Sequence, residues 1–398
     1  MNKKGLFDGW KWGKVSDIID FNPKYTIKKG VKVKYIEMAA VPEHSREIEY
    51  FQSREFKSGS KFKNGETLFS RITPCLQNGK TSKVSKLKEN EIANGSTEFI
   101  VLSPKDKRDE DFIYYLSLDN SFRKYAEKRM IGSTGRQRVS WQSLSEYKLL
   151  IPPLKNRIKI AEILSSLDDK IELNNQMNKN LENMAQTIFK QWFVDFEFPD
   201  ENGKPYASNG GKFVDSEMGL IPEGWRVEIL GDVIEISSGK RPKNKENKKS
   251  KNYNIPIAGA SKIMGFTSKS LYNKKLLIIG RVGTHGIIQK FNGEVWPSDN
   301  TLVITSKFYE FVYQILQKIN YKSLNIGSTQ PLITQTSIKN IKIIYSNEKE
   351  LLSFESLVKN INTKIIENKK ENSNLIKTRD SLLPKLMSGE IRVGDMGE

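Results

Sequence analysis

Cysteine and histidine are almost absent from this 398-residue chain, which contains one cysteine and two histidines. The single cysteine, Cys75, excludes an internal disulfide. These residues are also too few for a usual structural zinc site, which takes four Cys or His ligands. No run of about 18 apolar residues marks a transmembrane helix, and the N-terminal MNKKGLFDGWKWGK lacks the apolar core of a signal peptide. These absences predict a soluble, cytoplasmic protein without a metal site.

Motifs of common enzymes are also missing. A nucleotide-binding loop has the pattern G-x-x-x-x-G-K-[ST], but Gly79-Lys80-Thr81 supplies only its end, because Pro74 stands where the first glycine is needed. An adenine methyltransferase would show Asn/Asp-Pro-Pro-aromatic, and Pro152-Pro153 lacks both flanking residues. G-x-S-x-G, H-E-x-x-H and C-x-x-C do not occur. We therefore expect no catalytic residue on this chain.

Positive charge is concentrated in two blocks. The 65 basic and 47 acidic residues give a net charge of +18. Residues 1–150 carry a net +10 and residues 201–350 a net +9, whereas residues 151–200 and 351–398 carry −2 and +1. Two basic blocks separated by near-neutral segments predict two anion-binding bodies on a neutral frame.

The chain also repeats itself, with a period near 200 residues. The matched segments are Asp8–Lys11 with Glu223–Arg226, Leu68–Arg71 with Ile278–Arg281, Ser96–Leu102 with Ser298–Ile304, and Gly132–Thr134 with Gly327–Thr329. Such a period is too long for a solenoid and indicates a duplicated module. Each copy would hold a basic mixed α/β body followed by a neutral helix.

Two long segments show the 3-4 apolar spacing of helices. From Asn156 to Trp192, and from Val358 to Leu382, apolar residues recur at the a and d positions of about four heptads, and each seam contains two asparagines. Either helix alone could simply cover its own domain. The matching asparagine layers favour a mutual pair, because a buried polar layer fixes the register of a coiled coil.

An antiparallel register pairs every seam position, with residue numbers in each layer that sum to 546. The predicted pairs are Leu164 with Leu382, Ile171 with Leu375, Asn174 with Asn372, Asn178 with Asn368, and Leu181 with Ile365. One layer is a mismatch, because Leu167 faces Arg379. We expect the guanidinium of Arg379 to extend outward to solvent.

Short β-like runs and helical stretches fill the two basic bodies. The strands are expected at 33–38, 68–72, 99–103, 276–279 and 301–305, and the helices at 111–129 and 308–318. The segment 237–253 holds seven basic residues and one acidic residue, which predicts a mobile loop. The predicted fold is α+β, with two mixed α/β domains joined by two long antiparallel coiled-coil helices in a pseudo-two-fold internal repeat. The predicted segments are 1–150 and 201–350 for the two bodies, with helical regions at 151–200 and 351–398.

Several of these segments resemble the specificity subunits of Type I restriction-modification systems. The C-terminal Leu383–Ile391 resembles the typical ending of that family, and Pro222–Trp225 resembles the opening of its second half. Ile151–Leu154 and Ile188–Phe193 are similar to its central region. The resemblance spans the whole chain. One departure lies in the first module, where Trp12–Ser16 lacks the Leu-Gly found at residues 230–231.

The resemblance implies a role for each region. Each basic body would be a target recognition domain that reads one half of a bipartite site in double-stranded DNA. The helices would set the distance between the halves and dock two methyltransferase (modification) subunits and the restriction/translocase subunits. S-adenosylmethionine and ATP would then bind to those partner subunits, and this chain would be a non-catalytic recognition subunit.

Candidate DNA-binding residues come from the matched segments and the basic loop. Arginine and glutamine can bind guanine and adenine edges with two hydrogen bonds, and lysines can neutralise phosphates. The candidates in the first half are Arg71, Asn78, Lys80, Arg136, Gln137 and Arg138. The candidates in the second half are Lys240, Arg241, Lys243, Arg281, Thr284, His285 and Gln330.

Other functions fit part of this evidence. A two-headed transcriptional regulator would share the charge pattern, but no compact helix-turn-helix pattern is evident. A fused restriction enzyme needs the missing methyltransferase motifs, and a structural coiled-coil adaptor would not need a net charge of +19 on the two bodies. Lysine-rich usage throughout a proteome would also produce a basic chain. A pull-down that returns a methyltransferase would separate the first interpretation from these alternatives.

Overall fold

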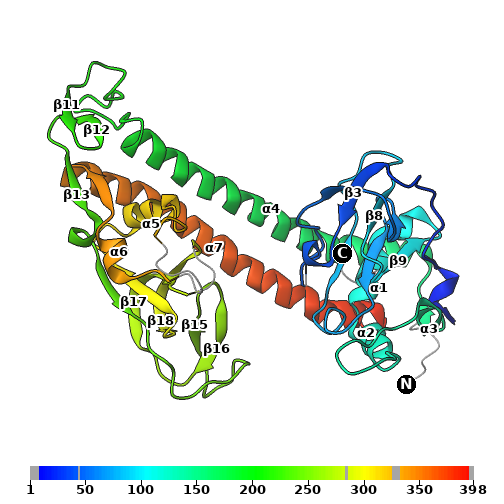
Figure 1. The fold of residues 1–398 in the computed structure, drawn as a ribbon. Coiled ribbons are helices and arrows are strands. Elements are labelled where there is room, and N and C mark those ends of the chain that lie inside the picture. The colour runs from blue at the N-terminus through cyan, green and yellow to red at the C-terminus, as the bar shows by residue number, and fades with distance from the viewer. Residues whose placement is uncertain (1–8, 44, 283–285, 325–331, 394–398) are drawn as a thin grey trace. The chain divides into compact units, whose positions relative to one another are not determined.

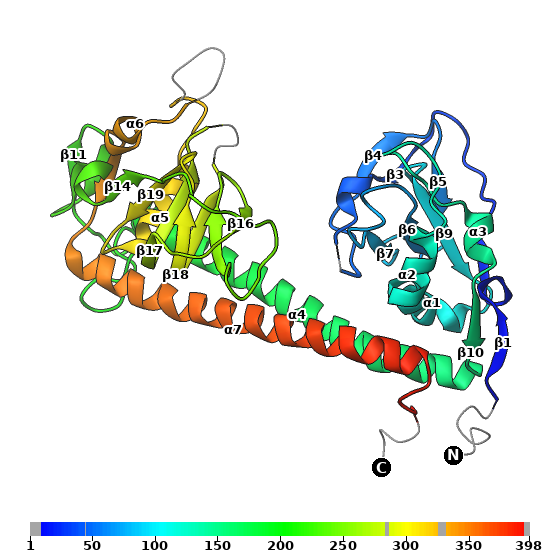
Figure 2. The same cartoon turned by 90° about the horizontal axis from the view of Figure 1, so that it is seen from below.

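The computed structural model describes residues 9–43, 45–282, 286–324 and 332–393. The chain forms two compact units: unit 1 holds residues 1–176 and 368–398, and unit 2 holds residues 177–367. The units cut across the four predicted segments, because each long helix contributes one part to each unit. Figures 1 and 2 show the elements of each unit from two directions.

Unit 1 contains two four-stranded sheets, with the strand orders β2-β9-β6-β7 and β4-β3-β8-β5, and a β1-β10 ribbon. The strands are β1 (Lys11–Lys14), β2 (Ile19–Phe21), β3 (Lys32–Ile36), β4 (Gln52–Glu55), β5 (Ser60–Phe62), β6 (Thr67–Ser70), β7 (Thr81–Lys83), β8 (Ala93–Gly95), β9 (Phe99–Pro104) and β10 (Lys148–Ile151). Alternate residues of β9 enter two different cores, Ile100 and Leu102 one core and Phe99 and Val101 the other. The β6-β9 sheet is therefore buried on both faces, which explains its continuous apolar runs.

The short helices of unit 1 are α1 (Glu110–Leu118), α2 (Asn120–Glu127) and α3 (Trp141–Ser145), with 3-10 turns at Val15–Asp17, Met38–Ala40 and Lys107–Asp109. The prediction of one helix over 111–129 was wrong. The side chain of Asp119 accepts hydrogen bonds from the backbone N–H groups of Ser121 (2.9 Å) and Phe122 (3.2 Å). It therefore caps a new helix at this point, since aspartate satisfies free N–H groups at a helix start.

Unit 2 contains a six-stranded sheet with the order β14-β19-β17-β18-β15-β16, and the two-stranded ribbons β13-β20 and β11-β12. The strands are β11 (Phe213–Ser216), β12 (Gly219–Pro222), β13 (Arg226–Ile229), β14 (Glu235–Ser238), β15 (Ile255–Ala258), β16 (Ile263–Thr267), β17 (Tyr272–Gly280), β18 (Ile288–Pro297), β19 (Thr301–Thr305) and β20 (Lys342–Tyr345). The short helices are α5 (Tyr309–Lys318) and α6 (Gln335–Lys339), with a 3-10 turn at Leu230–Asp232. The same alternation holds, because Leu277 and Ile279 of β17 enter one core and Leu276 and Ile278 enter another.

The two units share the topology of four sheet strands and of the ribbon that leads into a long helix. The order β2-β9-β6-β7 in unit 1 matches β14-β19-β17-β18 in unit 2. The opening strand pairs with the strand before a long helix in both, β1 with β10 and β13 with β20. Even the turn after the opening strand matches, because Val15 N–H donates to Tyr147 O and Leu230 N–H donates to Ile341 O. The predicted internal repeat is confirmed, including its first strand, where the sequence departs from the family.

Two 40-residue helices, α4 (Leu154–Phe193) and α7 (Glu348–Met387), run antiparallel (Figure 2). In unit 1, Asn174 Nδ2 donates to Asn372 Oδ1 at 2.8 Å, which is the contact that the predicted register requires. The other predicted pairs within one unit share a core, Leu164 with Leu382 in unit 1 and Leu181 with Ile365 in unit 2, whereas Ile171 and Leu375 are only half-buried. Asn178 and Asn368 are both buried, but their pairing would join the two units and stays a prediction. The predicted fold class is confirmed.

The outward path expected for Arg379 was wrong. This side chain is 2% exposed, and its Nη1 lies 2.7 Å from Oδ1 of Asp168, which is 3% exposed. Tyr115 donates its hydroxyl to the other Asp168 oxygen at 2.8 Å. The partner of Arg379 is therefore the residue after Leu167, and the seam holds a buried ion pair as a further polar layer.

Candidate nucleic-acid interface

In unit 1, polar residues that flank three strands lie at one edge of the β2-β9-β6-β7 sheet, which we call the main sheet. Strands β2 and β6 both run antiparallel to β9, so they end at the edge where β9 begins. Asn22 follows β2, Arg71 follows β6, and Glu98 precedes β9. The Arg71 N–H donates to Glu98 O (3.0 Å), while Arg71 O accepts from Val139 N–H (3.0 Å). The backbone of Arg71 is therefore fixed on both sides.

Unit 2 builds the same edge around Arg281. The Arg281 N–H donates to Asn300 O (3.0 Å), and Arg281 O accepts from Ile333 N–H (3.0 Å). In Arg71 and Arg281 alike, the side chain is partly exposed and its Nε is buried without a hydrogen-bond partner among the described residues. A buried donor without a partner costs free energy.

The loop 131–138 brings further predicted residues to the edge of unit 1. Thr73 N–H donates to Gln137 O at 3.0 Å, and Ile72 and Arg138 form an antiparallel bridge. Arg136 and Arg138 are exposed, and Gln137 is half-buried. The fold thus joins Arg71, Arg136, Gln137 and Arg138 in one cluster, although more than 60 residues separate the first from the others.

The predicted loop 237–253 was wrong at its start, because residues 237 and 238 end strand β14 and pair with β19. The basic loop, residues 239–253, leaves the sheet of unit 2 at the edge that holds Arg281. Gly239 N–H donates to Thr301 O (3.0 Å), and Lys240 N–H donates to Pro297 O (2.9 Å), which fixes the start of the loop at this edge. Lys240, Arg241 and Lys243 are exposed. The loop contributes no residue to the described core, and its first cation, Lys240, begins at the sheet edge that holds Arg281.

Two predicted residues have partners inside unit 1. Lys80 Nζ donates to Met38 O and Val41 O at 2.9 Å each, so this ammonium stabilises a turn of its own unit. Arg138 binds Glu98 with both Nε and Nη2, and this hydrogen bonding raises the pKa of Arg138. Asn78 is exposed in the turn before Lys80. Three predicted residues, Thr284, His285 and Gln330, lie outside the described residues.

Sequence reasoning missed Glu98, Asn300 and Asn22. Glu98 and Asn300 occupy matched places before β9 and β19 and supply the carbonyls that hold the two arginines. The repeat of Ser96–Leu102 as Ser298–Ile304 carried the signal, because it aligns these two positions. Asn22 Oδ1 accepts from Val101 N–H at 2.9 Å and so ends β2 at the same edge.

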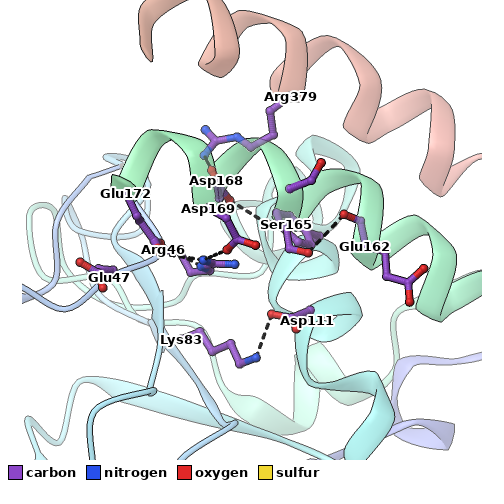
Figure 3. Close-up of polar contacts among 12 residues, drawn as sticks. Arg46, Glu47, Lys83, Asp111, Glu162, Ser165, Asp168, Asp169, Glu172 and Arg379 are labelled. Atoms are coloured by element: carbon purple, nitrogen blue, oxygen red, sulfur yellow. Dashed lines mark hydrogen bonds and ion pairs between the residues drawn. The ribbon is translucent and has the colours of Figure 1, made fainter. Parts of the chain in front are cut away.

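In unit 1 the loop that carries Arg46 is held on α4 by ion pairs (Figure 3). Arg46 binds Glu172 with Nε (2.9 Å) and Nη2 (2.7 Å), and it also binds Asp169. Burial opposes the charge of Arg46, but its hydrogen bonds to Glu172 and Asp169 raise its pKa above the ordinary value. Arg157, at the start of α4, binds both oxygens of the buried Asp109 at 2.8 Å. These bidentate contacts fix orientation as well as position.

Unit 2 uses a different set of polar contacts with its long helices. Lys290 of β18 binds Glu310 (2.6 Å) and Asn362 of α7 (3.3 Å). Glu355 of α7 accepts from the N–H groups of Glu310 (2.8 Å) and Phe311 (2.9 Å), at the start of α5. Burial raises the pKa of Glu355 to about 7. The mounting of unit 2 therefore contains a carboxyl group that titrates near neutral pH.

The described residues contain no group of three or more His, Cys, Asp or Glu side chains arranged to hold a metal ion. No helix in this part of the chain has the length and apolar character needed to cross a membrane. The arrangement offers exposed cations and hydrogen-bonding side chains at two similar sheet edges. Chemically, this suits the binding of a polyanion whose surface also carries donors and acceptors.

Comparisons with known proteins point the same way. The family described as "Type I restriction modification DNA specificity domain" matches residues 8–183 and 222–377. The Type I restriction enzyme MjaIX specificity subunit of Methanocaldococcus jannaschii is 30% identical over 74% of this chain and 72% of that protein. The HindI specificity subunit of Haemophilus influenzae is 26% identical over 83% and 87%. The solved S subunit from M. genitalium has a similar fold, with a TM-score of 0.56 at 15% identity over 97% of this chain and 98% of that one.

Proposed function

Because this chain belongs to the Type I restriction-modification DNA specificity family, we propose that each unit binds one half of a split DNA site. The observation that carries the proposal is the repeated sheet edge, with Arg71 and Arg281 in the same backbone environment. Unit 1 carries a net +11 and unit 2 a net +7, so each can attract phosphates on its own. Two similar but not identical reading edges suit a site whose two halves differ in sequence.

The paired helices suit the role of a ruler between the half-sites. Their register is fixed by the Asn174–Asn372 contact and by the buried Asp168–Arg379 pair. A polar layer disfavours sliding, because a shifted register would leave these groups buried without partners. Half-site spacing in DNA is then a consequence of protein geometry, as for other two-headed DNA-binding proteins.

Two apolar grooves at matched places suit the docking of two copies of one partner. In unit 1 the groove lies between β10, the end of α1 and the last turn of α7. In unit 2 it lies between the corresponding elements, which are β20, the end of α5 and the last turn of α4. The groove of unit 1 is lined by residues that include Trp12, Leu116, Leu150 and Met387. The groove of unit 2 is lined by residues that include Val194, Ile315, Ile319 and Ile344. We assign one methyltransferase subunit to each groove, with the restriction/translocase subunits joining this assembly.

In this proposal the chain recognises DNA in the cytoplasm and catalyses no reaction itself. S-adenosylmethionine would bind to the methyltransferase subunits and ATP to the restriction/translocase subunits. The recognition body is mounted on α4 by Arg46 and Arg157 in unit 1. Such a mount would keep each reading edge in a constant position relative to the partner that acts on the DNA.

Methylation profiling tests the reading role. The chain is assembled with its methyltransferase subunits, and methylated sites are sequenced for the wild type, Arg71→Ala and Arg281→Ala. Each variant should relax one half-sequence and leave the other half and the spacer unchanged. The two variants are matched controls for one another, because they change the same residue type in equivalent surroundings. Equal relaxation of both halves by either variant would refute the division of labour between the units.

Native mass spectrometry tests the docking role. Trp12 is 77% exposed and Val194 is 47% exposed, so aspartate at either place should leave the fold intact. Each single variant should retain one methyltransferase subunit, and the double variant should retain none. Two bound subunits on the double variant would show that the grooves serve another purpose.

A further inference from the structure

Ile131 is an aliphatic residue held in solvent beside the reading edge of unit 1. Its side chain is 81% exposed. Single exposed aliphatic residues are common on protein surfaces. This residue differs from most of them because its backbone is fixed and because its neighbours are the side chains expected to read bases.

The loop that carries Ile131 is a closed hairpin. Ile131 N–H donates to Arg138 O and Arg138 N–H donates to Ile131 O, both at 2.9 Å. Within the turn, Arg136 N–H donates to Ser133 O at 3.0 Å. Gly132 has φ +136°, and a Cβ there would lie 3.0 Å from Arg136 O, so the turn requires glycine. The hairpin therefore holds Ile131 outward rather than leaving it free to collapse onto the core.

The pairing also fixes what lies next to Ile131. Directly opposed residues of an antiparallel pair place their side chains on the same face, so Ile131 and Arg138 are neighbours. The guanidinium of Arg138 lies 2.7 Å from the carboxylate of Glu98, and both side chains are partly exposed. One small surface thus presents an apolar group, a set of N–H donors and a carboxylate acceptor.

These three chemistries correspond to the groups on base edges in the major groove. Thymine presents a C5-methyl group, cytosine an amino donor, and guanine two acceptors. The minor groove offers no methyl group. The tetrapeptide Ile-Gly-Ser-Thr also occurs in both halves of the sequence, at 131–134 and 326–329, as part of the internal repeat.

We infer that Ile131 is a specificity-determining residue that contacts the C5-methyl group of a thymine in the half-site bound by unit 1. The inference rests on the proposed DNA-recognition function. The contact would disfavour cytosine at that position, because cytosine lacks the methyl group, while Arg138 and Glu98 would read neighbouring edges. Burial of one methyl group contributes about fourfold to affinity.

Replacement of thymine by deoxyuridine tests this inference, because it removes only the C5-methyl group. The chain is assembled with its methyltransferase subunits on a fluorescent duplex, and binding is measured by anisotropy. The duplex carries the recognition site that methylation profiling identifies. Each thymine of the site is replaced in turn. One replacement should weaken the wild type about fourfold and should leave the affinity of Ile131→Ala unchanged.

Two further variants separate the contact from a loss of structure. Ile131→Val keeps the branched methyl groups and should still discriminate thymine from uracil. Leu220→Ala is a control that changes a 60% exposed aliphatic residue of unit 2, and it should behave as the wild type. The inference is overturned if every uracil replacement is neutral for the wild type, or if uracil weakens Ile131→Ala as much as the wild type. Absence of any sequence-specific binding would refute the DNA-recognition function itself, and the inference would fall with it.

Discussion

Breaking the buried pair between Arg379 and Asp168 should destabilise the long helices of unit 1. The two side chains are 2% and 3% exposed, and their N–O distance is 2.7 Å. Burial alone would lower the pKa of Arg379, but the charges of Asp168 and Asp380 raise it above the ordinary value, so this guanidinium is charged at neutral pH. Arg379→Leu leaves Asp168 with only the hydroxyl of Tyr115. An unpaired buried charge costs about 3–5 kcal/mol.

Hydrogen exchange of peptides from residues 154–176 and 368–387 gives the local measure of this destabilisation. A cost of about 3–5 kcal/mol corresponds to opening that is roughly a hundredfold or more frequent, since each 1.4 kcal/mol is a factor of ten. Asp168→Leu should cost a similar amount. The double variant should cost much less than the sum, because a well-packed apolar pair can replace a buried ion pair without loss of stability.

Glu367→Gln is the matched control on the same helix. Its partner, Lys364, lies 3.7 Å away, and both side chains are more than half exposed. Exposed pairs contribute less than about 1 kcal/mol. If Arg379→Leu changed exchange as little as this control, or if the Arg379 and Asp168 changes were additive, the buried pair would not stabilise the seam and the reasoning would be refuted.

Three other predictions follow from the same structure. Replacing Asn174 and Asn372 together by leucine should stabilise unit 1, because the change removes a costly polar layer. The Asp168–Arg379 pair should still hold the register, so the methylated DNA sites should keep the same spacer length. A changed spacer length would contradict this prediction. The raised pKa of Glu355, about 7, means that the folded unit keeps a proton which the unfolded chain releases near its ordinary value of 4.5. The stability of unit 2 should therefore fall as pH rises from about 4.5 to 7, and the melting temperature of the Glu355→Gln variant should lose this pH dependence. The same pH dependence in the variant and the wild type would show that Glu355 is not its source. Alanine at the five basic residues 240, 241, 243, 248 and 249 of the basic loop should make DNA binding less dependent on salt. The slope of log affinity against log salt concentration should become shallower by about 0.9 for each phosphate that the loop no longer neutralises. An unchanged slope would show that the loop does not contact DNA.

Local pattern was sufficient for the architecture of this protein. The repeat, the two basic blocks and the 3-4 spacing of 156–192 and 358–382 predicted two similar bodies and an antiparallel helix pair. The asparagines identified one register, and Asn174 contacts Asn372 as that register requires. Helix pairing could be derived because heptad spacing and polar layers are properties of the sequence itself.

The sequence patterns gave wrong predictions at two places. One contact depended on which of two adjacent helix residues faces the partner helix, and one helix start depended on a capping side chain. Arg379 was paired with an apolar position, because Asp168 lies one residue outside the counted seam. Asp119 was assigned to a helix interior, although its side chain caps a new one. A shift of one residue turns a helix position by about 100°, and no periodicity resolves which of two adjacent side chains meets a buried charge.

The sequence by itself determined the duplication, the two basic segments and the Asn174–Asn372 layer of the helix pair, because each is a pattern along one chain. Only the tertiary structure decided which residues share a surface. Arg71, Glu98 and Arg138 meet because antiparallel strands end and begin at one sheet edge. For the same reason Arg281 meets Asn300, and the next residue, Thr301, binds the start of the basic loop. Strand order is set by packing on both faces of the sheet, so the reading edges and the outward position of Ile131 become visible only once the two cores of each unit have formed.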